Sequence, residues 1–436
     1  DYRLHHGHED KLKHLNRALE SLSNADNLSV KNPTFDKNTQ AKIQTLPDKM
    51  VALVHFGRSG TGLLHSLIDG HPEVSTLPSI YFSEYFDHSN WVQLISDGWD
   101  GVIDRFITRY EVLFDASSSV PVETKSKELL INIGIKDGMA NVGDQKNEVL
   151  NVDKGLFREK LKCLMDSYSD LDAFLFFKLV HSSYNAAIND NNSKNLIFYH
   201  IHNPDVYAKL NFIRAAPKNN WIMTVREPLQ SLESWVNRDK EKSWYLRISN
   251  NIVSMLFEID NPIYSRQSSL GLRLEDIKKK PEKTIQALCK WMGIKESESL
   301  YEMTVQGKKW WGDPSSTDYS KDGMEPFGQT SINRKLGTLF SEKDQFILRT
   351  LFYPFSVRFG YTRENEEQFK VDLQKIKPMI GEIFDFEKDV AEKMQLSFEK
   401  LKGSGSYMYL RSGLIERWNT LNKFGTYPNM IKALKI

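Results

Sequence analysis

The sequence predicts an α/β protein with a doubly wound parallel sheet and helical appendages at both ends. Short apolar runs rich in β-branched and aromatic residues alternate with helical segments, which is typical of a parallel sheet. One run, Met50–Phe56, leads into a glycine-containing turn and then a helical run, Leu63–Asp69. This order of strand, loop and helix is the usual opening unit of such a sheet.

Three parts follow from the composition along the chain. Residues 1–46 are predicted to be a helical N-terminal extension and linker, because leucines recur on one face of Glu9–Ser23 and a polar, proline-containing stretch follows. Residues 47–362 form the predicted central domain. Residues 363–436 are charged and helical with a tyrosine-rich tail, for which homodimer formation or a lid is the expectation.

Further elements of the central domain are assigned from apolar runs and helical periodicity. The predicted strands are Phe174–Val180, Leu196–Ile201 and Trp221–Val225, and the predicted helices follow Arg226-Glu227-Pro228 and cover Pro281–Trp291 and Glu342–Phe352.

The bulk composition excludes several classes of function. With a net charge of +1 over 436 residues, the chain has no global field to attract nucleic acid. The two cysteines, Cys163 and Cys289, argue against a disulfide framework and a cysteine metal site, so a cytoplasmic location is expected. No apolar stretch is long enough for a membrane span. The first residue is Asp1 and not methionine, which leaves open whether upstream sequence was removed.

The turn after the first strand predicts a phosphate-binding loop. Glycines let the backbone approach an anion, which the N–H groups of a helix N-terminus stabilise. A nucleoside triphosphatase loop needs Lys-Ser/Thr after its last glycine, but here Leu63 follows Gly62 and the positive charge lies earlier, at Arg58. We therefore expect a phosphate donor that reacts without a metal clamp.

A second phosphate site is predicted at the end of the Trp221–Val225 strand. Arg226 follows this strand, and Ser234 lies eight positions later, two turns along the next helix. An arginine and a serine in these positions can converge on one phosphate at the carboxyl edge of the sheet.

Together these segments resemble the sulfotransferase superfamily, over roughly residues 47–362. The loop is similar to the family's 5′-phosphosulfate loop, and Arg226 with Ser234 is similar to its 3′-phosphate motif. The segments that carry the resemblance are Arg58-Ser59-Gly60-Thr61-Gly62, Leu67–Val74, Arg226 with Ser234, and Leu272–Ile277 with the helix ending at Trp291-Met292-Gly293. The resemblance implies a P-loop-like sheet, 3′-phosphoadenosine 5′-phosphosulfate as donor, 3′-phosphoadenosine 5′-phosphate as product, and no metal.

The chain departs from the family at two positions that contact adenine. Leu63 stands where cytosolic members have tryptophan, and Leu274 replaces a tyrosine, so the adenine contacts stay unassigned. The family's late phosphate-binding loop is best matched by Ser331–Gly337. The residues that the resemblance assigns to the nucleotide are Arg58, Ser59, Gly60, Thr61, Gly62, Leu63, Arg226, Ser234, Asn333, Arg334 and Lys335.

Sulfuryl transfer needs a base for the acceptor proton. Cytosolic members use a histidine before Leu-Pro at a strand end, and His202 occupies the similar place before Asn203-Pro204. On the alternative alignment, to protein-tyrosine sulfotransferases, His202 stabilises the transition state and Glu84 is the base. His181, after the predicted Phe174–Val180 strand, is a third candidate.

Two other classes of function stay open. A nucleotide kinase would depend on magnesium, although the loop lysine and magnesium carboxylates at strand ends are not evident in the sequence. A nucleotide-binding scaffold would need Arg58 and Arg226 but no base. The sequence does not identify the acceptor, and a carbohydrate, lipid, small metabolite or peptide tyrosine would each fit. The Trp310-Trp311-Gly312-Asp313 turn either lines the acceptor pocket or packs in the core.

Overall fold

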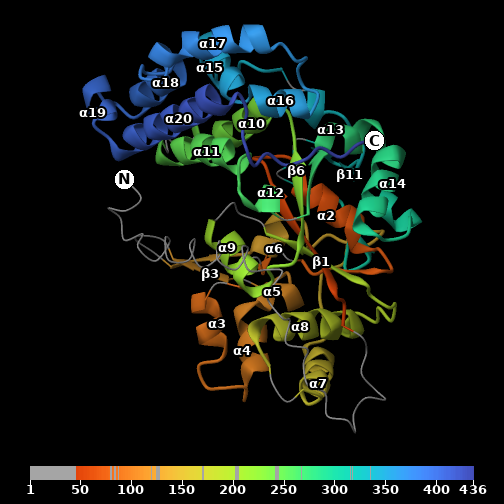
Figure 1. Ribbon diagram of the computed structural model, residues 1–436. Coiled ribbons are helices and arrows are strands. Elements are labelled where there is room, and N and C mark those ends of the chain that lie inside the picture. The colour runs from red at the N-terminus through yellow and green to blue at the C-terminus, as the bar shows by residue number, and fades with distance from the viewer. Residues whose placement is uncertain are drawn as a thin grey trace.

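The structure, a computed structural model, places most of the chain after residue 45 (Figure 1). The predicted N-terminal helix Glu9–Ser23 lies outside the described residues, as do short segments of the loops. The structure describes residues 46–78, 81–82, 85–86, 88–118, 120–123, 128–168, 171–201, 206–240, 245–266, 268–314, 316, 318–333 and 335–436.

The centre of the fold is a five-stranded sheet in which every neighbouring pair is parallel, in the order β2-β5-β1-β6-β7. From β1 the chain crosses to one side for β2 and β5, and then to the other side for β6 and β7. The reversal lies at β1, so a ligand crevice is expected outside the carboxyl ends of β1 and its neighbours. The predicted α/β fold class is confirmed. The strands are β1 (Lys49–His55), β2 (Val74–Ser75), β5 (Leu196–His200), β6 (Asn220–Val225) and β7 (Ser269–Arg273).

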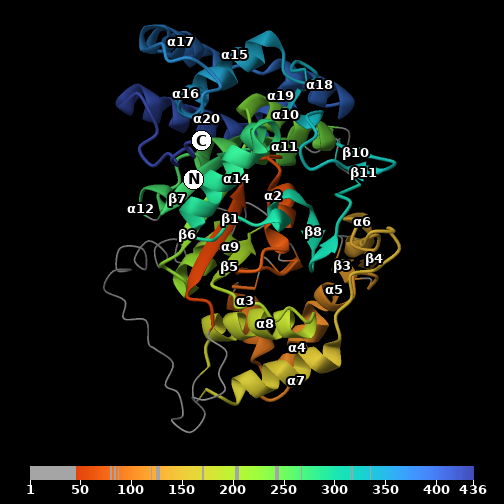
Figure 2. The same ribbon diagram turned by 90° about the vertical axis from the view of Figure 1, so that its right-hand side faces the viewer.

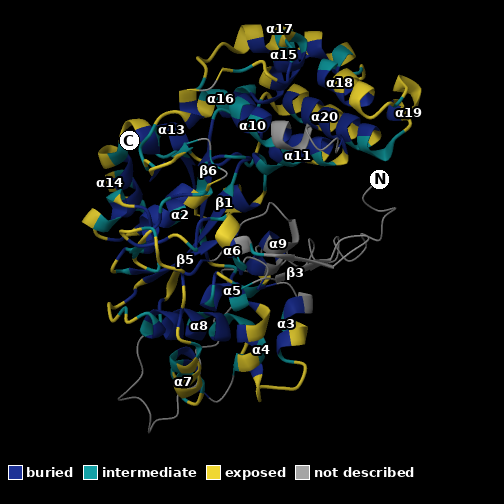
Figure 3. Cartoon of the chain, turned by 180° about the vertical axis from the view of Figure 1, so that it is seen from behind, coloured by how far each residue is buried: buried dark blue, intermediate teal, exposed yellow. Residues whose placement is uncertain are grey.

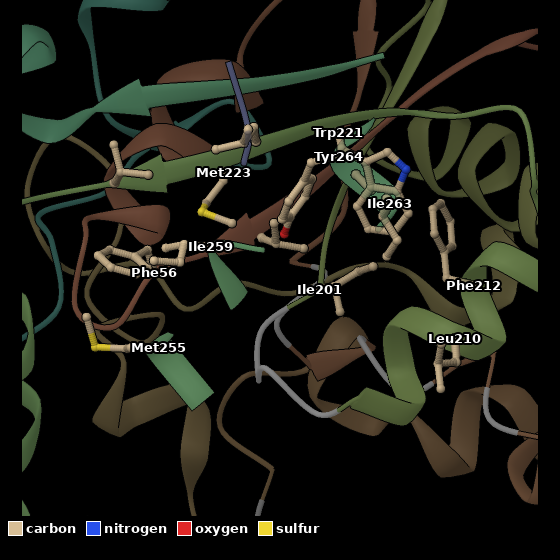
Figure 4. Close-up of a cluster of buried hydrophobic side chains, with 14 of the residues drawn as sticks. Phe56, Ile201, Leu210, Phe212, Trp221, Met223, Met255, Ile259, Ile263 and Tyr264 are labelled. Atoms are coloured by element: carbon tan, nitrogen blue, oxygen red, sulfur yellow. The ribbon is translucent and has the colours of Figure 1, made fainter. Parts of the chain in front are cut away.

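Alternation along β1 divides the hydrophobic interior into two cores. Ala52 and Val54 point into the first core, whereas Val51 and Leu53 point into the second, as the two-residue period of a strand requires. Figure 4 shows part of the first core, where Trp221 and Met223 of β6 meet side chains of neighbouring helices. Figure 3 shows the strands buried between helices whose outer faces carry exposed residues. Both faces of the sheet are therefore covered.

The helices that follow the strands agree with the sequence predictions. The helix after the glycine loop is α2 (Thr61–Asp69), and the helix after Arg226 is α10 (Pro228–Lys240). The two later predictions correspond to α14 (Pro281–Met292) and α15 (Glu342–Leu351). Helices α2 and α14 contribute to the second core, and α10 and α15 to the first.

One predicted strand is wrong. Phe174–Val180 belongs to helix α8 (Ala173–Ala187), whose N-cap Asp172 accepts a hydrogen bond from the Leu175 N–H at 2.7 Å. Most residues of this helix are buried, and its first half, residues 173–180, is apolar except for Lys178 and lacks the usual amphipathic period. A short apolar run of this kind does not distinguish a buried helix from a buried strand.

The other elements of the central domain are short or lie at its periphery. Its other helices are α3 (His88–Leu94), α4 (Val102–Arg109), α5 (Glu111–Phe114), α6 (Ile133–Lys136), α7 (Lys154–Met165), α9 (Val206–Ala215), α11 (Tyr245–Glu258), α12 (Ile263–Arg266), α13 (Leu274–Lys279), η2 (Glu298–Tyr301), η3 (Ser331–Asn333) and α16 (Tyr353–Arg358). Its short hairpins are β3 (Val120–Glu123) with β4 (Glu128–Ile131), β8 (Thr304–Val305) with β9 (Lys308–Lys309), and β10 (Tyr319–Ser320) with β11 (Gly323–Met324).

The C-terminal extension is helical and packs on the central domain. Leu410, Leu414 and Trp418 of the long last helix lie in the first core together with residues of the sheet. Figure 1 shows this helix running beside α11. None of the helices in the described part of the chain has the length and apolar character needed to cross a bilayer. The extension consists of α17 (Glu366–Met379), α18 (Asp385–Lys393), α19 (Phe398–Lys402) and α20 (Gly405–Phe424).

The segment after α20 returns to the sheet and covers its β7 edge. The Gly271 N–H donates to the Lys432 carbonyl at 2.6 Å, and the Leu434 N–H donates to the Gly271 carbonyl at 2.9 Å. A Cβ atom on Gly271 would overlap the ring of Phe359. The glycine therefore leaves room for Phe359 behind the strand while its backbone pairs with the tail.

Candidate active site

The predicted phosphate loop connects the carboxyl end of β1 to α2. Gly60 is the N-cap residue of α2, with φ of 84° and no side chain capping it, and the first intrahelical bond runs from the Leu64 N–H to its carbonyl at 3.1 Å. The N–H groups of residues 61–63 therefore precede the intrahelical ladder and point out of the helix at the sheet edge. This arrangement suits an anion.

Glycine is required in the loop chiefly because neighbouring helices approach it closely. Gly57 has φ of 60°, and a Cβ atom there would lie 2.5 Å from Ser231 Oγ of α10. A Cβ atom on Gly60 would lie 2.6 Å from Leu274 Cδ1 of α13. Ser231 also donates to the Phe56 carbonyl at 2.8 Å. The loop is thus held between the helices that follow β6 and β7.

The side chains of the loop divide into inward and outward groups. Ser59 is 1% exposed, and its Oγ lies 3.0 Å from Thr224 Oγ1 and accepts from the Phe56 N–H at 3.2 Å. Leu63 is buried in the second core. Arg58 and Thr61 are half-buried and Gly62 is exposed. Of the predicted loop residues, Ser59 and Leu63 therefore offer a ligand only their backbone.

Arg226 lies directly after β6 and is 3% exposed. Its Nη2 donates to the Ser331 carbonyl and to Gln230 Oε1, the latter at 3.3 Å. Ser234 is half-buried two turns further along α10. The arginine thus connects the end of β6 to the first residue of the predicted late loop.

Glu233, next to Ser234 on α10, holds the other end of that loop. Its Oε1 accepts from the N–H groups of residues 337, 339 and 340, each at 3.1 Å, and its Oε2 accepts from Thr338 Oγ1 at 3.2 Å. Asn333 and Lys335 are exposed between these two attachments, and Arg334 lies outside the described residues. Arg226 and Glu233 of α10 therefore hold the two ends of the predicted late loop.

A buried ion pair supports the same loop from α13. Lys278 Nζ lies 2.8 Å from Asp318 Oδ2, and the Ser331 N–H donates to Asp318 Oδ1 at 2.6 Å. Burial opposes ionisation of Asp318, but the hydrogen bonds from Lys278 and Ser331 prevail and lower the pKa of its carboxyl group.

Two carboxylates follow strand ends, and both accept hydrogen bonds from backbone N–H groups. Glu227 follows β6 by two residues and Glu275 follows β7 by two. Glu275 accepts from the Glu227 N–H at 3.0 Å and from Tyr361 Oη at 2.9 Å, and Glu227 accepts from the Gln230 N–H at 2.7 Å. Burial raises the pKa of Glu227. Both carboxylates thus position the backbone after Arg226.

Of the three predicted bases, the structure describes only His181. It is fully buried in α8 and lies at no strand end, and its Nδ1 is 2.9 Å from Ser75 Oγ of β2. Burial lowers the pKa of His181 to about 3, so the ring is neutral at physiological pH. His202 and Glu84 lie outside the described residues.

The Trp310 turn borders the phosphate loop. A Cβ atom on Gly62 would lie 3.9 Å from Cη2 of Trp310, and the indole Nε1 donates to the Asp137 carbonyl at 3.2 Å. Trp310 is also buried in the second core. Tyr81 Oη donates to Asp137 Oδ2 at 3.0 Å. The turn therefore packs in the core and at the same time lies beside the first turn of α2.

Sequence reasoning missed Glu233 and Ser231. Both lie inside the Arg226–Ser234 segment, so their position next to a predicted motif was the available signal. Their partners, however, come from residues 56 and 337–340, which are distant in sequence. Within the described residues, no three histidine, cysteine, aspartate or glutamate side chains gather as a metal-binding group.

Comparison with known proteins gives distant structural likenesses. No family model matches the chain, and no curated protein matches it. The sulfotransferase domain of the Synechococcus PCC 7002 olefin synthase is 13% identical, with a TM-score of 0.39, and the match covers 73% of this chain and 98% of that domain. The sulfotransferase domain from the curacin biosynthetic pathway is 14% identical, with a TM-score of 0.30 and coverage of 81% and 99%. Sulfotransferase STF9 from Mycobacterium avium is 12% identical, with a TM-score of 0.29 and coverage of 66% and 74%. With TM-scores below 0.5, these likenesses assign neither family nor activity.

Proposed function

We propose that the protein is a sulfotransferase that moves a sulfuryl group from 3′-phosphoadenosine 5′-phosphosulfate to an acceptor hydroxyl or amine. The observation that carries this proposal is the arrangement around β1 and β6. The uncapped N-terminus of α2 and the buried Arg226 lie at the same edge of the sheet. Helix α10 packs against the phosphate loop and also holds the late loop. Two anion-binding features on one edge suit a donor with two separate phosphate groups.

The residues present fit such a donor. Arg58, the N–H groups of residues 60–63 and the Thr61 hydroxyl would hold the 5′-phosphosulfate. Arg226 and Ser234, with the late-loop residues Asn333, Arg334 and Lys335, would hold the 3′-phosphate. The donor supplies the activated sulfuryl group, and direct in-line transfer then requires an aligned acceptor and a base.

The loop favours this donor over a nucleoside triphosphate. No lysine and hydroxyl pair follows Gly62, so the usual contacts to a terminal phosphate and to magnesium are lacking from the sequence. The cation of the loop is Arg58, whose planar guanidinium suits phosphate or sulfate oxygens. We therefore expect the transfer to proceed without a metal. The base is sought first among His202, Glu84 and His181, and the acceptor class stays open.

The first test is titration of 3′-phosphoadenosine 5′-phosphate into the protein by calorimetry without magnesium, with ATP as the comparison ligand. Loss of a charge-assisted contact should cost about 1.5–3 kcal/mol, so Arg58→Ala and Arg226→Ala should each weaken binding roughly 10-fold to 150-fold. The matched control is Arg158→Ala, because Arg158 on α7 pairs with Asp104 on the surface. Binding of ATP alone, and only with magnesium, would reject the proposal in favour of a kinase.

A second test separates an enzyme from a nucleotide-binding scaffold. Once binding is established, acceptors are screened with the labelled donor, and His202→Ala, Glu84→Gln and His181→Gln are compared. Turnover of an acceptor by the wild-type protein identifies an enzyme, and a variant that loses this turnover but still binds 3′-phosphoadenosine 5′-phosphate identifies a residue needed for the transfer. A scaffold binds the nucleotide in every variant and turns over no acceptor.

A further inference from the structure

His65 lies on the helix that begins at the phosphate loop. It follows Thr61 by four residues on α2, so the two side chains lie on the same face of the helix, one turn apart. Its side chain is half-buried. Its ring centroid is 5.9 Å from that of His200, the last residue of β5, and 6.0 Å from that of Phe198. His65 thus lies between the phosphate loop and the carboxyl end of β5.

The surroundings of His65 favour a neutral ring of one tautomer. Burial lowers the pKa of His65, against the opposing influence of Asp69 one turn further along and a hydrogen bond to the Leu77 backbone. The nitrogen that donates to the Leu77 carbonyl carries the proton, so the other nitrogen bears the lone pair. A backbone partner that fixes the tautomer of a histidine is the arrangement expected of an oriented base.

Two other described histidines, His181 and His71, differ from His65 in their burial. His181 is fully buried and packs against Phe177 and Phe82 in the first core. His71 is also fully buried, with its Nε2 2.8 Å from the Lys295 carbonyl and its Nδ1 accepting from the Glu73 N–H at 3.1 Å. Both are therefore enclosed on all sides, whereas His65 is only half-buried.

We propose that His65 is a further catalytic residue, which hydrogen-bonds the acceptor and takes its proton. The inference rests on the proposed sulfotransferase function. As the new bond forms between the acceptor oxygen and sulfur, the bond between sulfur and the donor's bridging phosphate oxygen breaks, and 3′-phosphoadenosine 5′-phosphate leaves. The acceptor proton passes to the lone-pair nitrogen of His65 and then to solvent. Among the described residues, the titratable side chains that face His65 include Asp69 on α2, His200 on β5 and His181 on α8.

The first readout needs no acceptor. The wild-type protein is labelled with ¹³C and with ¹⁵N-histidine, and the ring signals are assigned from through-space contacts, with Phe198 for His65 and with Glu73 for His71. Titration with 3′-phosphoadenosine 5′-phosphate should move the His65 ring signals and leave those of His71 in place. Signals of His65 that stay unchanged while calorimetry shows the nucleotide bound would overturn the proposal.

The second readout is turnover of labelled 3′-phosphoadenosine 5′-phosphosulfate, with water and phenol as acceptors, both of which are protonated at physiological pH. His65→Gln should lower turnover by about 100-fold to 10,000-fold, the usual contribution of a general base, while affinity for the product nucleotide changes less than about threefold. Added imidazole should restore part of the turnover of His65→Ala, because it can take the place of the missing ring. Any turnover that His71→Ala has lost should not be restored by imidazole.

The outcomes separate the two proposals. Retained turnover in a folded His65→Gln protein would reject the role of His65 and leave the sulfotransferase proposal intact. Failure of the wild-type protein to bind 3′-phosphoadenosine 5′-phosphate would reject both. Unfolding of His65→Gln, checked by circular dichroism, leaves the wild-type NMR titration as the deciding measurement.

Discussion

The two sides of the central strand β1 differ in how their polar side chains are held. On the β6 side, Arg226, Glu233 and Glu275 bond mostly to backbone groups of loops that are distant in sequence. On the β5 side, the polar groups include His65 and His181, which lie among apolar and aromatic side chains and have lowered pKa values. The first side holds charged groups that are hydrogen-bonded to the backbone, and the second holds neutral titratable rings.

This difference corresponds to the needs of the two proposed substrates. An anionic nucleotide is best bound by donors and cations that are fixed before it arrives, because no reorganisation is then required on binding. An acceptor hydroxyl needs a neutral group that can take a proton, and burial keeps a histidine neutral at physiological pH. The comparison predicts that variants on the β6 side change nucleotide affinity and stability, while those on the β5 side change pH dependence and turnover.

The largest effect on stability is expected for Gly57→Ala. The substitution forces a positive φ on alanine and brings its Cβ to 2.5 Å from Ser231 Oγ and 2.9 Å from Met255 Sδ. Strain and overpacking together should lower the free energy of unfolding by about 3 kcal/mol. The control is Gly98→Ala, which has φ of 72° and nothing within 4 Å, and should cost only about 1 kcal/mol. If urea denaturation shows equal losses of stability for Gly57→Ala and Gly98→Ala, α10 does not restrict the loop.

A smaller decrease in the free energy of unfolding, about 2 kcal/mol, is expected for Glu233→Gln. The substitution removes the negative charge of a side chain that accepts three backbone N–H hydrogen bonds. Leaving buried N–H groups without a charged partner lowers the stability of the folded protein. The late loop should loosen, so affinity for 3′-phosphoadenosine 5′-phosphate should fall about 10-fold by calorimetry. Exposed Glu298 on η2 gives the control Glu298→Gln, which should stay within about 0.5 kcal/mol. Unchanged affinity in Glu233→Gln would separate the late loop from nucleotide binding.

The buried His181 on the β5 side should make the free energy of unfolding depend on pH. His181 has a pKa of about 3 in the folded protein and about 6.5 when unfolded. Below pH 6.5 the unfolded chain binds a proton that the folded protein does not, so stability falls as the pH falls towards 3. Going from pH 6.5 to 5.5 should cost roughly 1 kcal/mol more in the wild type than in His181→Gln. Parallel denaturation profiles for the two proteins would contradict a neutral, buried His181.

The smallest change in stability is expected for Ser59→Ala, which tests whether the Ser59 side chain points into the protein. Ser59→Ala removes the acceptor of the Phe56 N–H and the contact with Thr224 Oγ1, which should cost about 1 kcal/mol of stability. Affinity for 3′-phosphoadenosine 5′-phosphate should change less than about threefold, whereas Thr61→Val should weaken it about 10-fold without loss of stability. If calorimetry instead shows that Ser59→Ala weakens binding and Thr61→Val does not, the Ser59 hydroxyl binds the ligand.

Local patterns were sufficient to predict the elements that carry the two phosphate motifs. Met50–Phe56 and Trp221–Val225 are apolar runs with strong strand composition, and each is followed by a loop whose residues exclude continuation of the strand. They correspond to β1 and β6, and the helices after them to α2 and α10. Short strands were not predicted: β2 has two residues and β7 precedes its helix without a turn signal.

The remaining features depend on contacts between distant residues. Helix α8 was predicted as a strand because its burial on most sides removes the periodic pattern. The role of Glu233 depends on backbone groups more than 100 residues further along the chain. The proximity of His65 to His200 depends on how α2 packs on β5. None of these relations has a local signature, so only the tertiary structure reveals them.

The pairing of Gly271 with residues 432 and 434 has a consequence for synthesis of the chain. A ribosome makes β7 about 160 residues before the segment that covers its outer edge. During this interval the nascent sheet has an unpaired edge strand, which other chains can join. A nascent-chain complex stalled before residue 430 should therefore associate with other chains or with chaperones more readily than one stalled after this segment has emerged.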